Sequence, residues 1–325
     1  MPSDNPPPDV SDPSAWIKAK RLASLLGPVP SSVGNVVKSL WRDHLVCMDT
    51  GTVEVSSTSN SAVRLVDKSS VLKLPLYFAA ESLHPERFAE VREDDGSRAL
   101  IRILHPGLFA ALLSLLYMHR RFKKICPSEQ WSELSKEYIL NMELGYLIGR
   151  GCPKIGEAFG VLMGGIRYAS LAIFLKHDPA GYDGYRNRKM TFNIPFEHER
   201  WSCDHGQIAG SLLRALGFGV DQMHSGNAIR ATTNTEFGAV SPDFSSWTTV
   251  IRLMEALKNK EKLSEVNLTD IGFTLSDEEI SSIVDSTNTL FEKGSSFTWM
   301  LKSYKSDDDR ADDDRAGDDR DGESS

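Results

Sequence analysis

FEHERWSCDHGQIAGSLLRALGFGVDQMHSGNAIRA, residues 196–231, is the stretch that decides the fold of this chain. It predicts a helix, a sharp break and a second helix. Asp204 can cap the first helix, and Gln207, three residues later, can complete a capping box. Gly217 then ends the helix. The apolar positions between them lie on one face of a 3.6-residue period, which predicts an amphipathic helix; they are Ile208, Ala209, Leu212, Leu213 and Leu216.

Outward from this stretch, the same period recurs in both directions. It predicts helices over residues 16–26, 31–45, 103–121, 131–150, 155–176, 244–257 and 276–293. Pro106 suits the first turn of its helix, and Ser276 with Glu279 forms a second capping box. The helix over 155–176 should lie deepest, yet it contains Gly160, Gly164 and Gly165, each costing about 1 kcal/mol relative to Ala. These glycines predict either a closely packed neighbouring backbone or a bend.

Residues 47–76 follow a different pattern. This segment is rich in Ser, Thr and Val with partial alternation, so it predicts two short strands or a mobile loop. We interpret it as a small irregular or β-containing insertion in an otherwise all-α, multi-helix bundle.

Composition and charge bound the domain. Residues 1–14 are rich in Pro, Asp and Ser and predict a disordered arm; residues 295–325 predict an acidic disordered tail, which leaves one helical domain over 15–294. The formal net charge is -8, but residues 306–325 alone hold nine Asp and one Glu against three Arg, which is -7. The body is therefore near -1, and its charge indicates no particular partner.

Cysteine usage and hydropathy indicate the compartment. Four widely spaced cysteines without a CxxC motif suit a reducing cytoplasm. The N-terminus lacks the pattern of a secretory signal, and the longest strongly apolar run, residues 107–118, is shorter than the roughly 20 residues of a membrane helix. We expect a cytoplasmic protein with no membrane partner.

The opening stretch resembles the HDOD domain, a bacterial signalling module related to HD-type metal phosphohydrolases. The resemblance rests on an acidic residue, an aspartate-histidine pair and an apolar helix, matched by Glu199, Asp204, His205, Gly210, Leu212, Leu213 and Leu216. HD-type enzymes hold a divalent metal with a central His-Asp pair, and the corresponding string here places Gly164 and Gly165 at those two positions. Glycine has no side chain to donate, so the resemblance implies a degenerate motif without a metal, a cofactor or catalytic residues.

The resemblance implies a non-catalytic regulatory module in bacterial signal transduction, a scaffold that binds other signalling proteins. Its working surface should hold exposed apolar or aromatic residues beside the core helices. Tyr182, Tyr185, Trp201 and Phe218 are candidates, and each fits a place in the core at least as well.

Two alternatives remain open. His198, Cys203, Asp204 and His205 are good ligand types, and with His119 or His224 they could serve a divergent metal-dependent phosphohydrolase. The basic cluster His119, Arg120, Arg121, Lys123 and Lys124 could contact the phosphates of nucleic acid, although it lacks an aromatic platform for bases.

Overall fold

The computed structural model describes residues 12–52, 54–90 and 96–301, and within these ranges every regular element is a helix. The all-α prediction is thereby confirmed. The α-helices are α1 (Pro13–Ala23), α2 (Ser31–Thr50), α3 (Ser57–Asp67), α4 (Ser70–Leu83), α5 (Pro85–Phe88), α6 (Gly96–Ile125), α7 (Ser128–Gly151), α8 (Glu157–His177), α9 (Pro179–Asn187), α10 (Ile194–Trp201), α11 (His205–Leu216), α12 (Gln222–Ile229), α13 (Pro242–Asn259) and α14 (Asp277–Lys293). Short 3-10 helices are η1 (Ser24–Leu26), η3 (Leu263–Glu265), η4 (Thr269–Ile271) and η5 (Phe297–Leu301).

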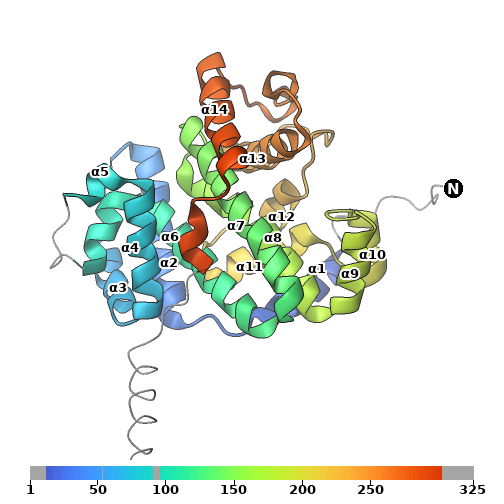
Figure 1. The fold of residues 1–325 in the computed structure, drawn as a ribbon, viewed down its shortest axis with the longest axis horizontal. Coiled ribbons are helices and arrows are strands. Elements are labelled where there is room, and N and C mark those ends of the chain that lie inside the picture. Colours follow the sequence, from blue (N-terminus) through green and yellow to red (C-terminus); the bar gives the residue numbers. More distant parts are fainter. Residues whose placement is uncertain (1–11, 53, 91–95, 302–325) are drawn as a thin grey trace, which may run out of the picture.

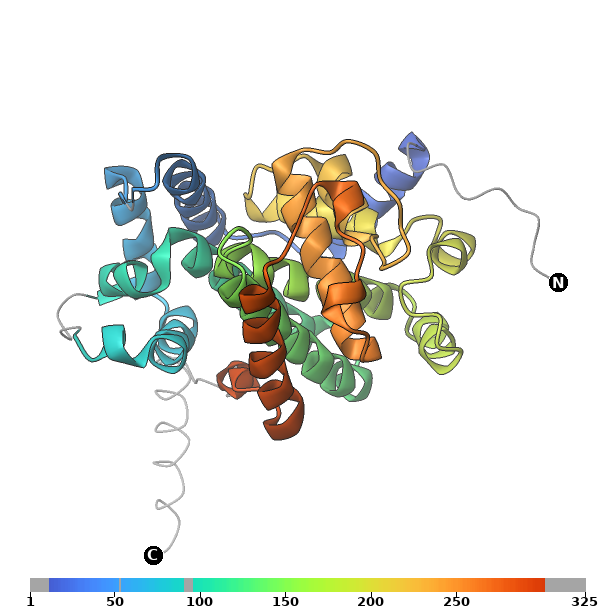
Figure 2. The same ribbon diagram turned by 90° about the horizontal axis from the view of Figure 1, so that it is seen from above.

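Helices α7 and α8 form the centre of the bundle (Figures 1 and 2). On one side lie α2 to α6, and on the opposite side lie α9 and α10. Helices α13 and α14 cover a third side, and α11 packs beneath α8. The central helices are thus enclosed by elements from both halves of the chain.

The central pair packs backbone against backbone. A Cβ atom added to Gly160 would lie 2.0 Å from the carbonyl oxygen of Gly145, and one added to Gly164 would lie 2.0 Å from that of Asn141. In the opposite direction, a Cβ on Gly145 would lie 2.1 Å from the carbonyl oxygen of Gly160. Small residues at this spacing let two helices approach closely, which gains dispersion energy along both backbones. The predicted close neighbour is therefore α7.

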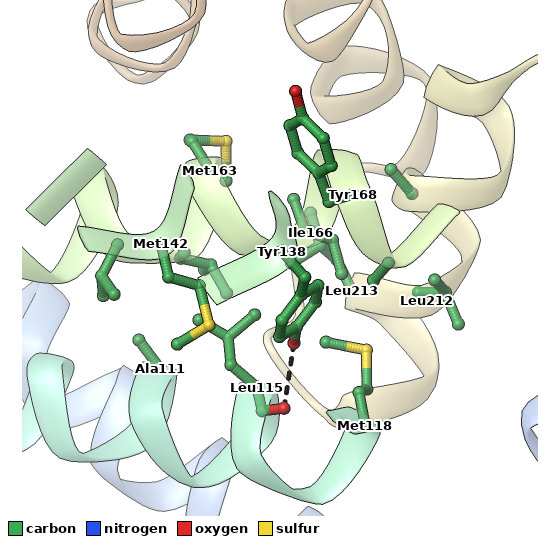
Figure 3. Close-up of a cluster of buried hydrophobic side chains, with 14 of the residues drawn as sticks. Ala111, Leu115, Met118, Tyr138, Met142, Met163, Ile166, Tyr168, Leu212 and Leu213 are labelled. Carbon is green, nitrogen blue, oxygen red and sulfur yellow. Dashed lines mark hydrogen bonds between the residues drawn. The ribbon is translucent and has the colours of Figure 1, made fainter. Parts of the chain in front are cut away.

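Helix α8 is the buried axis of the molecule, as its apolar pattern predicted. Every residue from Ala158 to Leu175 is buried. Figure 3 shows how side chains from α6, α7, α8 and α11 converge there, with Leu115, Met142 and Ile166 among them. The Tyr138 hydroxyl is satisfied within this cluster because it donates to the carbonyl oxygen of Leu115 at 2.9 Å. Its polar group therefore sits in the core at little cost.

Helix α6 consists of two segments that meet at a kink. His105 has φ 58° and ψ 156°, outside the helical region, and Pro106 begins the second segment, as predicted. Pro at the first position of a helix costs no hydrogen bond, because that N–H has no intrahelical partner. The segment after the kink is buried from Pro106 to His119.

Helices α6 and α8 are long and apolar enough to cross a membrane. In this structure, 89% of the most apolar window of α6 and 100% of that of α8 is buried inside the protein. Their apolar surface is covered by neighbouring helices, which is the arrangement of core helices in a bundle.

The expectation of an irregular or β-containing insertion over residues 47–76 was wrong for the part that the structure describes. Helix α2 extends to Thr50, and α3 and most of α4 occupy the rest. The Ser56 side chain caps α3, and the Ser56 amide donates to the carboxylate of Asp43 at 2.8 Å. Val63 and Val66, three residues apart, are both buried. Packing of this helical face against α2 and α6 outweighs the strand propensity of its Ser, Thr and Val residues.

The domain is also longer at each end than the predicted range 15–294. Asp12 caps α1, which begins at Pro13. At the other end, the carboxylate of Glu143 accepts hydrogen bonds from the amide and hydroxyl of Ser296, at 2.7 and 2.6 Å, and Phe297 of η5 is fully buried. The prediction that 295–325 is a disordered tail therefore fails for residues 295–301. The remainder of the predicted arm and tail, residues 1–11 and 302–325, lies outside the described part of the chain.

Candidate functional site

The candidate site lies where α10 gives way to α11. Ser202 ends α10 in the left-handed conformation with φ 58°, and Asp204 then caps α11. The Asp204 carboxylate accepts the Gln207 amide at 3.0 Å, and the Gln207 side chain accepts the Asp204 amide at 3.1 Å. The predicted capping box and the stop at Gly217, which is left-handed with φ 98°, are both confirmed.

Asp204 is the centre of a buried ion network. Arg230, the first residue after α12, donates to the Asp204 carboxylate from Nε to Oδ1 and from Nη2 to Oδ2, each at 2.8 Å. His198 Nε2 lies 2.9 Å from Oδ2 of the same carboxylate. Burial alone would raise the pKa of Asp204, but the hydrogen bond from His198 and the charge of Arg230 hold that pKa well below its usual range. Asp204 is therefore an ionised carboxylate whose charge Arg230 compensates.

A second buried pair adjoins the first. Glu197 of α10 accepts the His205 amide at 2.9 Å and lies 2.7 Å from His205 Nδ1, both through Oε2. Its other oxygen accepts the Tyr185 hydroxyl. Burial, followed by the charge of Glu197, raises the pKa of Tyr185. His205 Nε2 is buried and has no hydrogen-bond partner among the described residues.

Three residues of the kinds that bind metals come together here, and both of their carboxylates already have hydrogen-bond partners. One ligand atom each from Glu197, Asp204 and His205 lies within 4.8 Å of the others. Both oxygens of Asp204 already bind the Arg230 guanidinium, and both oxygens of Glu197 accept hydrogen bonds. A divalent cation would have to displace a fixed positive charge from a fully buried position. The cluster is a buried network in which Arg230 compensates Asp204 and hydrogen bonds from Tyr185 and His205 satisfy Glu197.

Gly164 and Gly165, which the resemblance would place at the HD-type ligand positions, face neighbouring helices. A Cβ on Gly165 would lie 2.4 Å from Leu115 Cδ2 of α6 and 2.9 Å from Met142 Cγ of α7. Gly164 lies against the backbone of Asn141, as described above. At Gly164 the obstacle is the α7 backbone, whereas at Gly165 a side chain would have to displace the Leu115 and Met142 side chains.

The other candidate ligands do not join this site. His119 packs against Trp131 and Tyr138 in the core, and burial together with the nearby Arg120 and Lys123 lowers its pKa to about 4. His224 forms a hydrogen bond with Ser241 at 2.9 Å near the surface. Cys203 is fully buried, and burial followed by the charge of Asp204 raises its pKa, so its thiol is protonated.

Glu199, the acidic residue matched to the family motif, is exposed on α10. The buried acid is Glu197, two residues earlier, which sequence reasoning missed. The signal was present in its spacing, because Glu197 precedes the buried Trp201 by four residues and so shares its helix face. Arg230 was missed too, because nothing local marks it as the partner of Asp204.

The aromatic residues expected at a working surface belong to the core, since Tyr182, Tyr185, Trp201 and Phe218 are exposed by at most 3%. Phe174 stacks on Trp201 with ring centroids 4.0 Å apart, and Trp41 meets Phe218 edge to face. These rings therefore stabilise the core of the bundle and do not form a surface for a partner.

The basic cluster at the end of α6 is divided between structure and solvent. Arg121 Nε donates to the carbonyl oxygen of Leu26 at 3.1 Å and so anchors η1, while His119 is buried. Lys123 and Lys124 are exposed. Arg120, Arg121 and Lys124 line one pocket, so of the predicted cluster only His119 is withdrawn into the core.

Comparison of the chain with protein-family models, with curated proteins and with solved structures finds no match. The resemblance to the HDOD domain accordingly remains a prediction that rests on the residues named above.

Proposed function

We propose that this chain is a non-catalytic, cytoplasmic regulatory module that acts by binding other signalling proteins, as its resemblance to the bacterial HDOD domain implies. The observation that carries the proposal is the packing of Gly164 and Gly165. At Gly164 a metal-ligating side chain would not fit without moving the α7 backbone, and at Gly165 it would have to displace the Leu115 and Met142 side chains. A hydrolase of the HD type needs its ligand pair at these positions.

The ion network around Asp204 gives further support. Arg230 supplies the charge that a metal ion would supply, so the aspartate-histidine pair serves to join α10, α11 and the end of α12. This role is structural, and it leaves the module without the metal-bound water that a phosphohydrolase uses as nucleophile.

A binding role needs an exposed surface, and α2 to α4 offer one. Six of the ten large apolar side chains that are exposed in the described residues lie there: Leu45, Val46, Met48, Leu65, Leu74 and Phe78. Leu45 and Leu65 line one groove between α2 and α3, with a volume of about 730 Å³. Apolar residues gathered at the surface are typical of protein interfaces.

Metal analysis of the purified full-length protein tests the proposal against the enzymatic alternative. We expect far less than one transition-metal ion per chain and the same trace content in His205→Ala. A stoichiometric metal that is lost in His205→Ala would refute the non-catalytic assignment.

Partner capture tests the binding role. Full-length wild type and the double variant Leu45→Ser/Leu65→Ser are used as baits in the native host, with Ile17→Ser as the matched control because Ile17 is 70% exposed on α1. We expect a partner that the wild type and the control retain and the double variant loses. Equal retention by all three baits would place the interface elsewhere.

A further inference from the structure

A polar pocket lies between α7, α8, α13 and the connector that precedes α10. It has a volume of about 240 Å³. Buried Asn141, Arg167 and Tyr168 line it together with exposed Lys258, so it extends from the core to the surface. In Figure 3 the Tyr168 hydroxyl points away from the apolar cluster around Ile166.

Arg167 is the unusual residue of this pocket. It is only 4% exposed, and its guanidinium carbon lies 4.1 Å from the centre of the Phe192 ring. Its Nε and Nη2 atoms are buried and have no hydrogen-bond partner among the described residues. Burial lowers the pKa of Arg167, and the charge of the nearby Glu255 is the largest effect that opposes this shift. Buried donors without acceptors destabilise a fold, and more so when they carry charge.

The other buried arginines show what Arg167 lacks. Arg230 makes two hydrogen bonds of 2.8 Å to the Asp204 carboxylate. Arg252 donates to the two carboxylate oxygens of Asp270 at 2.6 and 2.8 Å. A guanidinium presents a rigid fork that fits a carboxylate or a phosphate in this way. Arg167 offers the same fork to the pocket, and no carboxylate of the described chain binds it.

The remaining groups of the pocket favour an anion. Three cationic and two acidic side chains line it, which gives a net charge of +1. Both acids are engaged, since Glu137 accepts two hydrogen bonds from Arg186 and Glu255 accepts the Thr233 amide at 2.7 Å. Lys258 donates to the Tyr168 hydroxyl and brings a second positive charge to the pocket. Arg186 and Glu137 pair with each other, so Arg167 and Lys258 face the single carboxylate of Glu255, and one positive charge of the pocket is left over.

From this geometry we infer that the pocket binds a small molecule through one carboxylate or phosphate group, held by Arg167 and Lys258. The inference goes beyond the proposed scaffold role and rests on the pocket alone. It gives the module a ligand whose occupancy would stabilise the junction of α8 with α13, because both helices contribute a cation to the same anion.

Thermal unfolding of the full-length protein with inorganic phosphate and with acetate as probes tests the inference, with sodium chloride at matched ionic strength as reference. A ligand that binds only the native state raises the unfolding temperature in a concentration-dependent way. We expect at least one of the two anions to raise the unfolding temperature. A response to phosphate alone would indicate a phosphate ligand, and a response to acetate alone would indicate a carboxylate ligand. Titration calorimetry then gives the affinity for that probe.

Arg167→Met is the decisive variant. Loss of a charge-assisted hydrogen bond should weaken binding of the active probe by about tenfold or more. Without a probe, its unfolding temperature should equal or exceed that of the wild type, because an unpaired buried charge has been removed. Lys258→Met should also weaken binding of the probe. Because Lys258 is exposed, this substitution should leave the fold intact, so it tests the pocket even if Arg167→Met misfolds. Arg214→Met, on the exposed face of α11, should bind as the wild type does.

Two results would overturn the inference. One is a wild type that phosphate and acetate stabilise no more than chloride does. The other is an Arg167→Met protein that unfolds at a lower temperature yet keeps its full response to the probe, since Arg167 would then serve only the fold. Neither result depends on partner binding, so failure here is distinguishable from failure of the scaffold proposal.

Discussion

Replacing Gly164 by Ala tests the closest contact between the central helices. The new Cβ would lie 2.0 Å from the carbonyl oxygen of Asn141, whereas ordinary contacts begin at 3.4 Å. Since the obstacle is backbone, α7 and α8 must separate locally by about 1 Å, which forfeits roughly a quarter to a half of the dispersion energy of each affected contact. Overpacking of this kind costs about 3 kcal/mol, and the higher helix propensity of Ala returns about 1 kcal/mol. We expect a net loss of about 2 kcal/mol in the free energy of unfolding.

The measurement is equilibrium unfolding in urea followed by far-ultraviolet circular dichroism. Gly184→Ala is the matched control, because Gly184 lies inside α9 and a Cβ there meets nothing within 4 Å. The control should gain up to about 1 kcal/mol from helix propensity alone. If Gly164→Ala were as stable as Gly184→Ala, the backbone contact between α7 and α8 would not exist, and the argument that no ligand side chain fits at this position would fall with it.

The other predictions concern buried charge. Asp204→Asn leaves Arg230 buried without its counter-ion and should lower the unfolding free energy at neutral pH by about 3 to 5 kcal/mol in urea unfolding. Because the pKa of Asp204 is lowered in the fold, the carboxylate stabilises the protein above its unfolded pKa of about 4, and this stabilisation is lost as the pH falls further. The unfolding free energy of Asp204→Asn should therefore fall less steeply below about pH 4 than that of the wild type. The same steepness in both proteins would contradict the network. His119→Phe tests the opposite case, a buried base that the fold keeps neutral. The pKa of His119 is about 4 in the fold against about 6.5 in the unfolded chain. The unfolding free energy of the wild type should therefore fall by about 3 kcal/mol between pH 6.5 and pH 4, and that of the variant should not show this fall. Identical pH profiles of wild type and His119→Phe would show that His119 is not buried as described.

Local signals in the sequence predicted the local structure well. The capping boxes at Asp204 and Ser276, the stop at Gly217 and the helix start at Pro106 all form as expected. Each depends on hydrogen bonds or steric limits within a few residues, so the chain carries the whole of the information locally. The deep position of α8 was also predicted, from apolar residues recurring at helical spacing between Ile155 and Ile173.

Local propensity failed where packing outweighed it. The Ser, Thr and Val residues near Val63 predict strand or loop, yet they form α3 because Val63 and Val66 fill a gap against α2 and α6. The end of the domain was misplaced for the same reason, because the buried carboxylate of Glu143 holds Ser295 and Ser296 at a distance of about 150 residues along the chain.

The sequence alone predicted a bundle of helices, the bounds of several of them, and a deepest helix whose glycines need a close neighbour. The packing of distant helices was needed to show that α7 is this neighbour, that Glu197 and not Glu199 is the buried acid, and that Arg230 compensates Asp204. It also showed that Arg167 lines a pocket with no carboxylate of the described residues hydrogen-bonded to it. The difference lies in the sequence separation of the interacting residues. Helix caps and apolar periods depend on residues within one or two turns of a helix, whereas a buried charge finds its partner on a helix that is distant in the sequence.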